Sequence, residues 1–588
     1  MTASPTDTTC PYCGVGCGVT VTPGPDGVKV SGSSVHPANH GRLCSKGAAL
    51  GETLGHEDRL LEPQVDGHGV DWGTALDKVA DGFRRTIEKH GPDSVAFYVS
   101  GQLLTEDYYV ANKLMKGFIG SANIDTNSRL CMASSVAGHK RAFGADAVPC
   151  SYEDLEAASL IVLVGSNAAW CHPVLYQRLV RAKDTNPGLK VVVVDPRATA
   201  TVDLADLHLT IAPGMDVVLF NGLLAYLDSE GLTDASFVDD HTEGMAAALA
   251  TARSSAGSPS SVAAQCGVPV DDVREFYALF AEHERVVSVY SQGVNQSSSG
   301  TDKVNAIINC HLLTGRIGHE GAGPFSFTGQ PNAMGGREVG GLANQLAAHM
   351  ALEDWSHRDR VQRFWRSPVM ADTAGLKAVD LFEAMGEGRI KAVWIMATNP
   401  AVSLPDNRRV REALARCELV VVSDCHRQTD TTEFADILLP ATTWGEKNGT
   451  VTNSERRISR QRAFLPAPGK SRPDWWMVSQ VAQRLGFAEA FAYTAPAQIF
   501  REHAALSGFE NHGQRLFDIS ALSTLSDDDY DSLAPIQWPV TVDRPRGTPR
   551  LFTDRRFFTP TGRARFVAVS PQAPANAPGE AYPWSLNT

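Results

Sequence analysis

The sequence predicts a multidomain α/β protein with a small cysteine-rich module at its N-terminus. Residues 1–60 are rich in Cys, Gly and Pro, and after them short apolar runs alternate with helical segments. The 588 residues are enough for about three to five domains. A hydrophobic content of 43% and a charged content of 20% are ordinary for a globular protein that buries a large core.

Each predicted strand is a short, continuous apolar run that ends at Gly, Asn, Asp or Pro, as buried parallel strands usually do. Helical segments separate these runs, so parallel sheets covered on both faces are expected. A helix is predicted over NAIINCHLLTGRIG (305–318), with Cys310 and His311 as packing residues, and TARSSAGSPSS (251–261) predicts a turn-rich linker or surface loop. The clearest strands are residues 94–100, 160–167, 190–197, 285–293, 392–400 and 418–426.

The charge pattern excludes some classes of partner. The net charge is −13 and no block of basic residues occurs, which argues against nucleic acid or an anionic membrane as the main partner. No run approaches the roughly 18 apolar residues that a membrane span needs. The start, MTASPTDTTC, has no basic region, apolar region or twin arginine, so a cytoplasmic location is expected. There, the eleven cysteines are expected to be thiols or metal ligands.

Four cysteines near the N-terminus have the spacing C-x2-C-x3-C-x26-C: Cys10, Cys13, Cys17 and Cys44. A [4Fe–4S] cluster needs four thiolates, one for each iron. A structural zinc site also uses four cysteines, but zinc ribbons favour two similar C-x2-C knuckles, whereas here three cysteines share one loop. The spacing therefore favours the cluster. Lys46 follows the last ligand and is expected to offset thiolate charge and to contact a second redox group.

Five longer segments resemble the molybdopterin oxidoreductase family and, within it, the assimilatory and periplasmic nitrate reductases. They are residues 10–19, 126–146, 150–167, 311–341 and 434–457. The resemblance implies a multidomain molybdopterin-oxidoreductase architecture, with a small N-terminal iron–sulfur domain and two parallel-sheet α/β domains. It also implies molybdenum bis(molybdopterin guanine dinucleotide) beside the [4Fe–4S] cluster.

The resemblance also implies domain boundaries. We expect a [4Fe–4S] domain at 1–60, a discontinuous α/β domain at 61–128 plus 343–540, and a molybdopterin-binding α/β domain at 129–342. Residues 541–588 are expected to be a linker toward a C-terminal dinucleotide-binding domain that this chain lacks. Three explanations for the expected lack of that domain stay open: a truncated reading frame, a domain supplied by a separate chain, or a degenerate protein.

By the same resemblance, Cys131 in NSRLCM is the thiolate ligand of molybdenum, and a soft thiolate suits a redox metal. Met132 follows it, where formate dehydrogenases of the family carry a histidine that takes a proton. This difference favours oxygen removal from nitrate over formate oxidation. Arg337 is expected to orient nitrate because its planar guanidinium matches a planar oxyanion, although a helix-terminal ion pair is an alternative. Met334 would narrow and dry the same funnel.

Ligands of open α/β sheets lie beyond the carboxyl ends of the strands, where turns and helix N-termini offer N–H groups to phosphate. None of the strand ends has the GxGxxG pattern of nicotinamide or flavin sites. Predicted cofactor contacts at strand ends are Gly165, Ser166, Asn167, Asp195, Pro196, Arg197, Gly214, Asp216, Gln292, Ser423 and Asp424. The resemblance adds Lys46, Gln102, Asn127, Gln296, Asn399, Lys447 and Asp474.

The implied reaction is the two-electron reduction of nitrate to nitrite and water in nitrate assimilation. Electrons would enter through the cluster and pass Lys46 and one pterin to the molybdenum. The donor stays open between ferredoxin and a separate NADH-linked flavoprotein subunit. Two alternatives to a nitrate reductase also stay open: a formate dehydrogenase of the same family, and an inactive truncated fragment.

Overall fold

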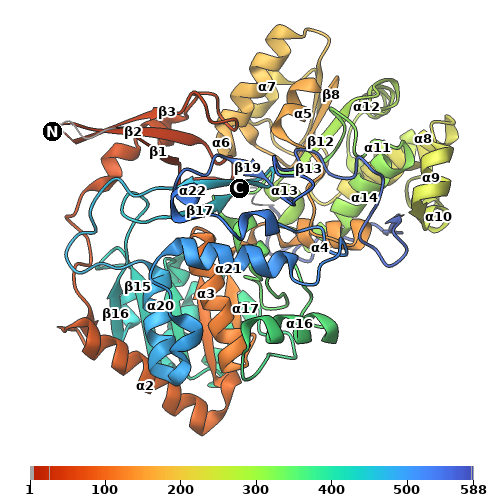
Figure 1. The fold of residues 1–588 in the computed structure, drawn as a ribbon. Coiled ribbons are helices and arrows are strands. Elements are labelled where there is room, and N and C mark those ends of the chain that lie inside the picture. The colour runs from red at the N-terminus through yellow and green to blue at the C-terminus, as the bar shows by residue number, and fades with distance from the viewer. Residues whose placement is uncertain (1–4, 25–26, 585, 587–588) are drawn as a thin grey trace. The chain divides into compact units, whose positions relative to one another are not determined.

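The computed structural model describes residues 5–24, 27–584 and 586. The chain forms two compact units, and each unit combines two separate stretches of sequence (Figure 1). The first unit is Met1–Leu130 with Gln330–Gly547, and the second is Cys131–Gly329 with Thr548–Thr588. Residues 330–342, which the predicted division assigned to the second α/β domain, belong to the first unit. The predicted division into four parts otherwise stays a prediction.

The first unit is built on a seven-stranded sheet with the order β5-β4-β16-β15-β14-β6-β7. The last five strands in that order are parallel, whereas β4 and β5 add an antiparallel pair at one edge. The bounds are β4 (Gln64–Val65), β5 (His68–Gly69), β6 (Val95–Val99), β7 (Ile124–Thr126), β14 (Ala392–Met396), β15 (Leu419–Asp424) and β16 (Ile437–Pro440).

Helices cover both faces of this sheet, so its central strands are apolar on both sides. On one face, Phe97 and Trp394 lie edge to face, and Phe83 of α2 (Trp72–His90) packs on Phe97. On the other, Tyr98 contacts Phe382 of α17 (Ala378–Gly386) within the apolar core. The alternation of neighbouring residues 97 and 98 between the two faces is the period of a strand. It explains why continuous apolar runs marked these strands.

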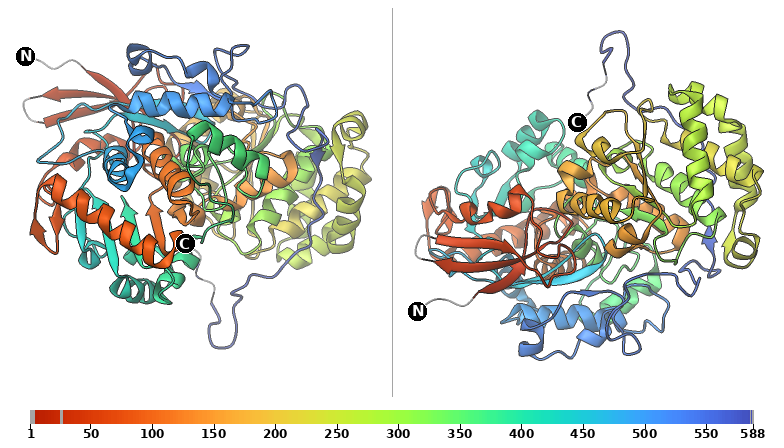
Figure 2. Two further views of the ribbon diagram at one scale, coloured as in Figure 1. Left: turned by 60° about the horizontal axis from the view of Figure 1, so that its bottom comes forward. Right: turned by 90° about the horizontal axis from the view of Figure 1, so that it is seen from above.

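The N-terminal module is a separate antiparallel sheet of β1 (Thr6–Thr9), β2 (Gly18–Gly24) and β3 (Gly27–Gly32), drawn in red in Figure 2. A second small sheet of the unit contains β17 (Gly449–Thr452), β18 (Arg457–Gln461) and β19 (Ile536–Gln537). The other helices of the first unit are α1 (Ser45–Ala48), α3 (Thr105–Asn112), α15 (Ala333–Glu338), α16 (Trp355–Trp365), α18 (Pro400–Ser403), α19 (Asn407–Arg416), α20 (Asp474–Ala482), α21 (Pro496–Gly508) and α22 (Asp527–Asp531).

The second unit is built on a five-stranded, fully parallel sheet with the order β10-β9-β8-β12-β13. Its strands are β8 (Leu160–Val164), β9 (Lys190–Val194), β10 (Leu207–Leu209), β12 (Val286–Tyr290) and β13 (Gly323–Ser326), with a short pair of β11 (Thr242–Glu243) and β20 (Ala564–Arg565). Its helices are α4 (Ala133–Phe143), α5 (Tyr152–Ala157), α6 (Ala168–Cys171), α7 (Pro173–Thr185), α8 (Asp216–Ser229), α9 (Ala235–His241), α10 (Met245–Ala256), α11 (Pro259–Cys266), α12 (Val270–Glu282), α13 (Gln292–Asn295) and α14 (Gly300–Leu313).

The predicted fold class is confirmed, and so are all six predicted strands, which are β6, β8, β9, β12, β14 and β15. The helix predicted from residue 305 is also present as α14, where Cys310 and His311 are buried packing residues.

The loop predicted at 251–261 is wrong. The segment belongs to α10 and α11, which are interrupted only at Gly257 and Ser258. The Ser258 side chain caps α11 by accepting from Ser261 N, and Pro259 occupies the first helical turn. Within α10, the Ser255 hydroxyl donates to the carbonyl of Thr251. Ser, Gly and Pro therefore occur at the junction between two helices here. The residues on both sides of that junction are helical.

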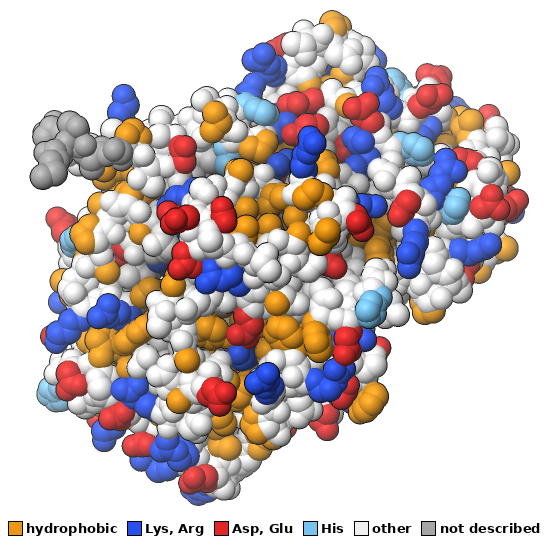
Figure 3. Space-filling model, in the orientation of Figure 1, with side chains coloured by type: hydrophobic (Ala, Val, Ile, Leu, Met, Phe, Trp, Pro, Cys, Tyr) orange, Lys and Arg blue, Asp and Glu red, His pale blue; other side chains and the backbone are white. Residues whose placement is uncertain are grey.

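No helix in the described ranges is long and apolar enough to cross a membrane. On the face drawn in Figure 3, acidic and basic side chains are interspersed rather than gathered by sign.

Candidate cofactor and active site

The loop that holds three of the four N-terminal cysteines is a tight turn closed by the backbone. Cys10 N donates to Cys17 O at 2.8 Å, and Gly16 N donates to Cys13 O at 3.2 Å. Gly16 has a φ of +67°, and a Cβ there would lie 2.5 Å from the Cβ of Asn453. Both the left-handed backbone and the close approach therefore require glycine at this position.

The four thiols lie near one another. Burial raises the pKa of Cys10 to about 12, with further contributions from Cys13 and Cys44, and burial also raises the pKa of Cys17. Four thiols are the ligand number of a [4Fe–4S] cluster and also of a four-cysteine zinc site.

Lys46 lies beside this group, as expected. Its exposed side chain places Nζ 5.9 Å from the centroid of the Tyr12 ring, and its positive charge acts on the Cys10 thiol. The position is suited to offsetting the negative charge of bound thiolates.

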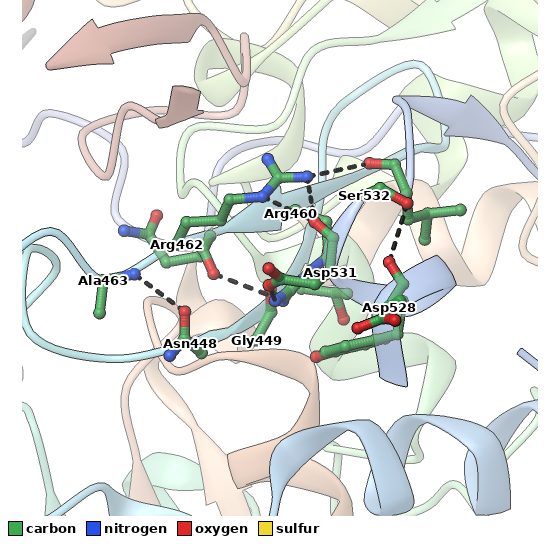
Figure 4. Close-up of polar contacts among 12 residues, drawn as sticks. Asn448, Gly449, Arg460, Arg462, Ala463, Asp528, Asp531 and Ser532 are labelled. Carbon is green, nitrogen blue, oxygen red and sulfur yellow. Dashed lines mark hydrogen bonds and ion pairs between the residues drawn. The ribbon is translucent and has the colours of Figure 1, made fainter. Parts of the chain in front are cut away.

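Hydrogen bonds tie the cysteine module to the sheet of β17, β18 and β19. Asn453 Nδ2 donates to Val15 O at 3.1 Å, and Ser454 N donates to Gly14 O at 2.8 Å. Farther along the same sheet, Arg462 donates through Nη1 to Asp7 O at 3.0 Å and through Nε to Asp531 O at 2.8 Å (Figure 4). The cluster loop is thus held by residues more than 400 positions away in the chain, which no local pattern in the sequence indicates.

In the first unit, the chain order reverses between β6 and β14, so the crevice at their carboxyl ends is the expected ligand position. Asn127 and Asn399 lie there and are partly buried. Asn127 Oδ1 accepts from Gly101 N at 2.7 Å, and its Nδ2 donates to Thr398 Oγ1 at 3.4 Å. Asn399 Oδ1 accepts from Thr431 at 2.7 Å. These two amides shape the crevice.

The neighbouring side chains differ in how open they are to a ligand. Gln102, which follows β6, is exposed. Ser423 accepts a hydrogen bond from the indole of Trp394 at 3.0 Å and is fully buried in the sheet, so it is engaged by the protein itself. Asp424 accepts from His426 N at 2.9 Å, and burial raises its pKa.

Lys447, predicted as a cofactor contact, lies in a buried group of charges. Its Nζ is 3.4 Å from Asp474 Oδ2 and 3.6 Å from Asp107 Oδ2. Burial opposes its charge, but these two carboxylates outweigh that effect and raise the pKa of Lys447. Burial raises the pKa of Asp474 to about 7, although Lys447 works against it. Asp474 Oδ1 is buried and accepts no hydrogen bond within the described structure. An orphaned carboxylate oxygen suits the N–H edge of a purine ligand.

In the second unit, the chain order reverses between β8 and β12. Gly293 N donates to Gly165 O at 2.9 Å, and a Cβ on Gly165 would lie 2.8 Å from Gly293 Cα, so the two backbones meet directly. The Ser166 hydroxyl is buried and has no partner in the described ranges, whereas Asn167 Oδ1 accepts from Thr201 at 3.0 Å. A buried hydroxyl at a strand end is suited to a phosphate or a sugar hydroxyl, and cofactor binding by these residues stays a prediction.

Beyond β9 and β10, the predicted residues are partly engaged by the protein. Asp195 accepts from Arg197 N at 2.9 Å, a turn-forming contact, and burial raises its pKa. Pro196 and Arg197 are exposed. Gly214 has a φ of +91°. Asp216 forms an ion pair of 2.7 Å with the buried Lys303, a partner that sequence reasoning missed because nothing local links the two residues.

Cys131 lies at the carboxyl edge of the second sheet. A Cβ added to Gly329 would sit 3.5 Å from Cys131 Sγ and 2.7 Å from Gln292 Nε2. Gly329 follows β13 and Gln292 follows β12, so the thiol is at the end of two parallel strands. Cys131 is only partly buried. A Cβ at position 329 would clash with the Gln292 amide but would only make an ordinary contact with the sulfur, so the close approach of Gln292 favours glycine there. Gln296, four residues after Gln292, is exposed, and its backbone N donates to Gln292 O at 2.7 Å.

Arg337 and Met334 belong to α15 in the first unit, and both are buried. Arg337 Nη2 donates to Met334 Sδ at 2.7 Å, so the structure brings these two predicted residues together. A Cβ on Gly335 would lie 2.6 Å from Thr105 Oγ1, and one on Gly336 3.1 Å from the Tyr108 ring. The glycines therefore allow α15 to pack closely on α3.

Comparisons with known proteins agree with this arrangement. The family model described as "Molybdopterin oxidoreductase" matches residues 59–484, and the model "Molybdopterin oxidoreductase Fe4S4 domain" matches residues 4–56. These matches support a [4Fe–4S] cluster and a molybdopterin cofactor, which confirms the cofactor prediction over the zinc alternative. Which side chains bind them stays a prediction.

The chain is 57% identical over 585 residues to a nitrate reductase of Klebsiella oxytoca and 50% identical over 571 residues to one of Shewanella frigidimarina. These alignments cover 99% and 95% of this chain but only 66% and 61% of the relatives, so the chain spans less than two thirds of their length. Acetylene hydratase from Pelobacter acetylenicus shares the fold, with a TM-score of 0.75, 19% identity, and coverage of 96% of this chain and 77% of that chain.

More distant relatives carry other names. A periplasmic nitrate reductase of Desulfovibrio desulfuricans is 38% identical over 81% of this chain and 65% of its own length. An F420-dependent formate dehydrogenase subunit alpha of Methanocaldococcus jannaschii is 32% identical over 99% of this chain and 83% of its own length.

Proposed function

Because the chain belongs to the molybdopterin oxidoreductase family, we propose that it is the catalytic part of a nitrate reductase. The reaction is nitrate + two electrons + two protons → nitrite + water. The observation that carries the proposal is the partly buried Cys131 thiol beside Gly329 and Gln292, beyond the ends of β13 and β12, with Met132 in the next position. Two relatives that are 57% and 50% identical to this chain are named nitrate reductase.

The residues at the two strand-end crevices fit a nucleotide-bearing cofactor. In the second unit, the Gly165–Gly293 backbone contact and the orphaned Ser166 hydroxyl would hold one end of a molybdopterin guanine dinucleotide. In the first, Lys447 would pair with phosphate and the free Asp474 oxygen would accept from a guanine N–H. When bound, the cofactor supplies two-electron redox chemistry at a molybdenum held by pterin sulfurs and a protein thiolate.

The chain's own residues supply ligation, orientation and dryness. Cys131 would act as a thiolate, and Met132, which is buried, offers no group that takes a proton from a substrate. Arg337 would orient nitrate by presenting two N–H groups to two oxygens of the planar anion. Its bond to Met334 Sδ fixes the guanidinium and occupies one N–H, and the methionine side chain excludes water from the same place. Lys46 would balance charge beside the reduced cluster.

The biological setting is part of the proposal. We assign the activity to nitrate assimilation in the cytoplasm, with ferredoxin or a separate NADH-linked flavoprotein as the electron donor. The interspersed surface charges and the net charge of −13 favour a small-anion substrate bound by a few local cations over nucleic acid. Cell fractionation of the native host separates this setting from a periplasmic one, and turnover with each reduced donor identifies the donor.

The test uses the full chain purified without oxygen. We expect about four iron atoms and about one molybdenum per chain, and nitrite formation from nitrate with reduced methyl viologen. Cys131→Ser is expected to lower nitrite formation at least about 100-fold and to change the molybdenum spectrum, because a hard hydroxyl replaces a soft thiolate. Cys171→Ser, at another partly buried cysteine of the same unit, is the matched control and should leave both unchanged.

Three results would overturn the proposal. Unchanged nitrite formation and an unchanged molybdenum signal in the Cys131→Ser variant would show that Cys131 is not the ligand of molybdenum. Formate oxidation with a viologen acceptor, without nitrate reduction, would identify a formate dehydrogenase instead. Cluster absorbance without molybdenum would identify an electron-transfer fragment.

A further inference from the structure

The buried ammonium of Lys116 binds the loop that follows α15, the helix that contains Arg337. Lys116 lies in the π-helix Lys113–Ile119 and is completely buried. Its Nζ donates to Gly340 O at 2.5 Å, Gln345 O at 2.7 Å and Leu342 O at 3.0 Å. The fourth oxygen is Asn112 Oδ1 at 2.9 Å. An ammonium has three protons, so these four oxygens use its whole donor capacity, and three of them are carbonyls of one short loop.

That loop is the C-terminal cap of α15. Gly340 has a φ of +78°, and its N donates to Arg337 O at 3.1 Å. Gly341 N then donates to Gly336 O at 2.7 Å, and Ala348 N returns to Glu338 O at 2.7 Å. A helix of six residues is too short to be stable through its own hydrogen bonds, so its contacts decide where it lies. A cation at the carbonyl end of a helix is also favourable toward the helix dipole.

A buried carboxylate binds the same loop through a backbone amide instead of a carbonyl. Asp125, fully buried, accepts from Ala343 N at 3.1 Å and pairs with Arg129 at 3.0 Å. Its second oxygen accepts from Ala378 N at 2.8 Å. Lys116 therefore takes the carbonyls of the loop while Asp125 takes an amide, and the loop is fixed from two sides by groups of opposite charge.

We propose that Lys116 is a positioning residue for Arg337: its ammonium holds the 340–345 loop and so sets where the anion-orienting guanidinium lies. The inference rests on the proposed function, in which Arg337 contacts nitrate. Lys116 contacts neither substrate nor cofactor in this account and acts only through the end of α15.

The protonation state of Lys116 supports this role. Burial lowers the pKa of Lys116 to about 7, Asp125 partly offsets that effect, and Arg129 adds to it. These are the charged groups that act on the ammonium. As the pH rises through about 7, the ammonium loses one of its three donors, so one carbonyl of the loop loses its partner. The loop should be better held below that pH than above it.

Lys116→Met tests the inference, with Lys113→Met as the matched control. Lys113 is a second buried lysine of the same helix, but its Nζ bonds to Glu502, Tyr493 and Ala490 O instead. In the full chain, Lys116→Met is expected to raise the KM for nitrate at least tenfold with less than a threefold change in kcat. Amide hydrogen exchange of residues 338–348 should become at least tenfold faster. Lys113→Met should change neither, and both variants should keep wild-type iron and molybdenum contents.

A pH series on the wild-type chain gives a second measurement if Lys116→Met does not fold. After correction for intrinsic exchange, the protection of residues 338–348 should fall as the pH rises from 6 to 9. The KM for nitrate should rise over the same interval. The inference is overturned if Lys116→Met leaves KM and loop exchange unchanged, if both variants loosen the loop equally, or if the wild-type protection is independent of pH. Absence of nitrate reduction in the wild type would refute the proposed function, but the exchange measurements would still decide whether Lys116 holds the loop.

Discussion

Single buried carboxyl groups are the residues on which pH should act most strongly. Glu106 is completely buried in α3, and burial raises its pKa to about 7. Its oxygens accept from Thr450 N at 2.8 Å, Thr450 Oγ1 at 3.0 Å and the Tyr530 hydroxyl at 2.7 Å. Between the ordinary pKa of a glutamate and about 7, the folded chain keeps a proton that the unfolded chain has released. The free energy of unfolding must therefore fall as the pH rises through that interval.

Glu106→Gln removes this titration but keeps the shape of the side chain. An amide can accept from Thr450 N and donate to the two hydroxyls. We expect the variant to gain about 1–3 kcal/mol relative to wild type between pH 5 and pH 8, measured by urea unfolding followed by tryptophan fluorescence. Glu412→Gln, on the exposed surface of α19, should follow the wild type. A constant difference between Glu106→Gln and wild type at all pH values would contradict the shifted pKa.

Candidate site residues could be predicted from the sequence where they belong to a recognisable motif. The four N-terminal cysteines lie near one another and Cys131 lies beyond the ends of β12 and β13, but which side chains bind the cofactors stays a prediction. The structure also shows which predicted residues are already used within the protein: Ser423 bonds to Trp394, and Asp216 pairs with Lys303. Neither fact was accessible earlier, because each partner is distant in the chain and is brought close only by packing.

At the scale of elements, the cluster loop depends on a turn that only glycine fits. Gly16→Ala would place a methyl group 2.5 Å from the Cβ of Asn453 and impose a left-handed backbone on alanine. The strain alone costs roughly 1–2 kcal/mol, and the displaced Asn453 would lose its bond to Val15 O. We expect iron content and cluster absorbance to fall at least twofold while molybdenum binding, which uses other residues, falls less.

Gly55→Ala is the control for that prediction. Gly55 has an extended backbone with a φ of −63°, and nothing lies within 4 Å of a Cβ added there. The control should keep the wild-type iron content. If Gly16→Ala also keeps it, the turn does not limit assembly of the cluster.

Elements with strong periodicity were predictable, and those set by packing were not. Buried strands such as β8 and β14 are apolar at every position, so the sequence alone indicated them. The break between α10 and α11 has the composition of a loop, but Ser258 caps the N-terminus of α11 and Pro259 lies in its first turn. A turn signal gives the position of a break, and the number of residues in the break depends on what packs around it.

For the whole molecule, cofactor binding should be visible as stability. A ligand that binds only the folded chain raises its free energy of unfolding by RT ln(1 + L/Kd), where L is the free ligand concentration. Chain produced in a host that cannot make molybdenum cofactor is therefore expected to melt at least about 5 °C lower than chain that contains molybdenum. Differential scanning calorimetry of both preparations, matched for iron content, measures this difference. Equal melting temperatures would show that the two strand-end crevices do not hold a tightly bound cofactor.

The sequence by itself determined the α/β class and the six central strands, because apolar periodicity is a local feature. Cysteine spacing favoured the [4Fe–4S] cluster, and the molybdopterin cofactor was implied by the resemblance of longer motifs to a known family. The tertiary structure decided which of those residues are open to a ligand and which are bound by the protein. It assigned residues 330–342 to the unit of the iron–sulfur module, and it brought Lys116 to carbonyls more than 220 residues away. Long-range pairing of buried charges depends on how finished elements pack, and no spacing along the chain records it.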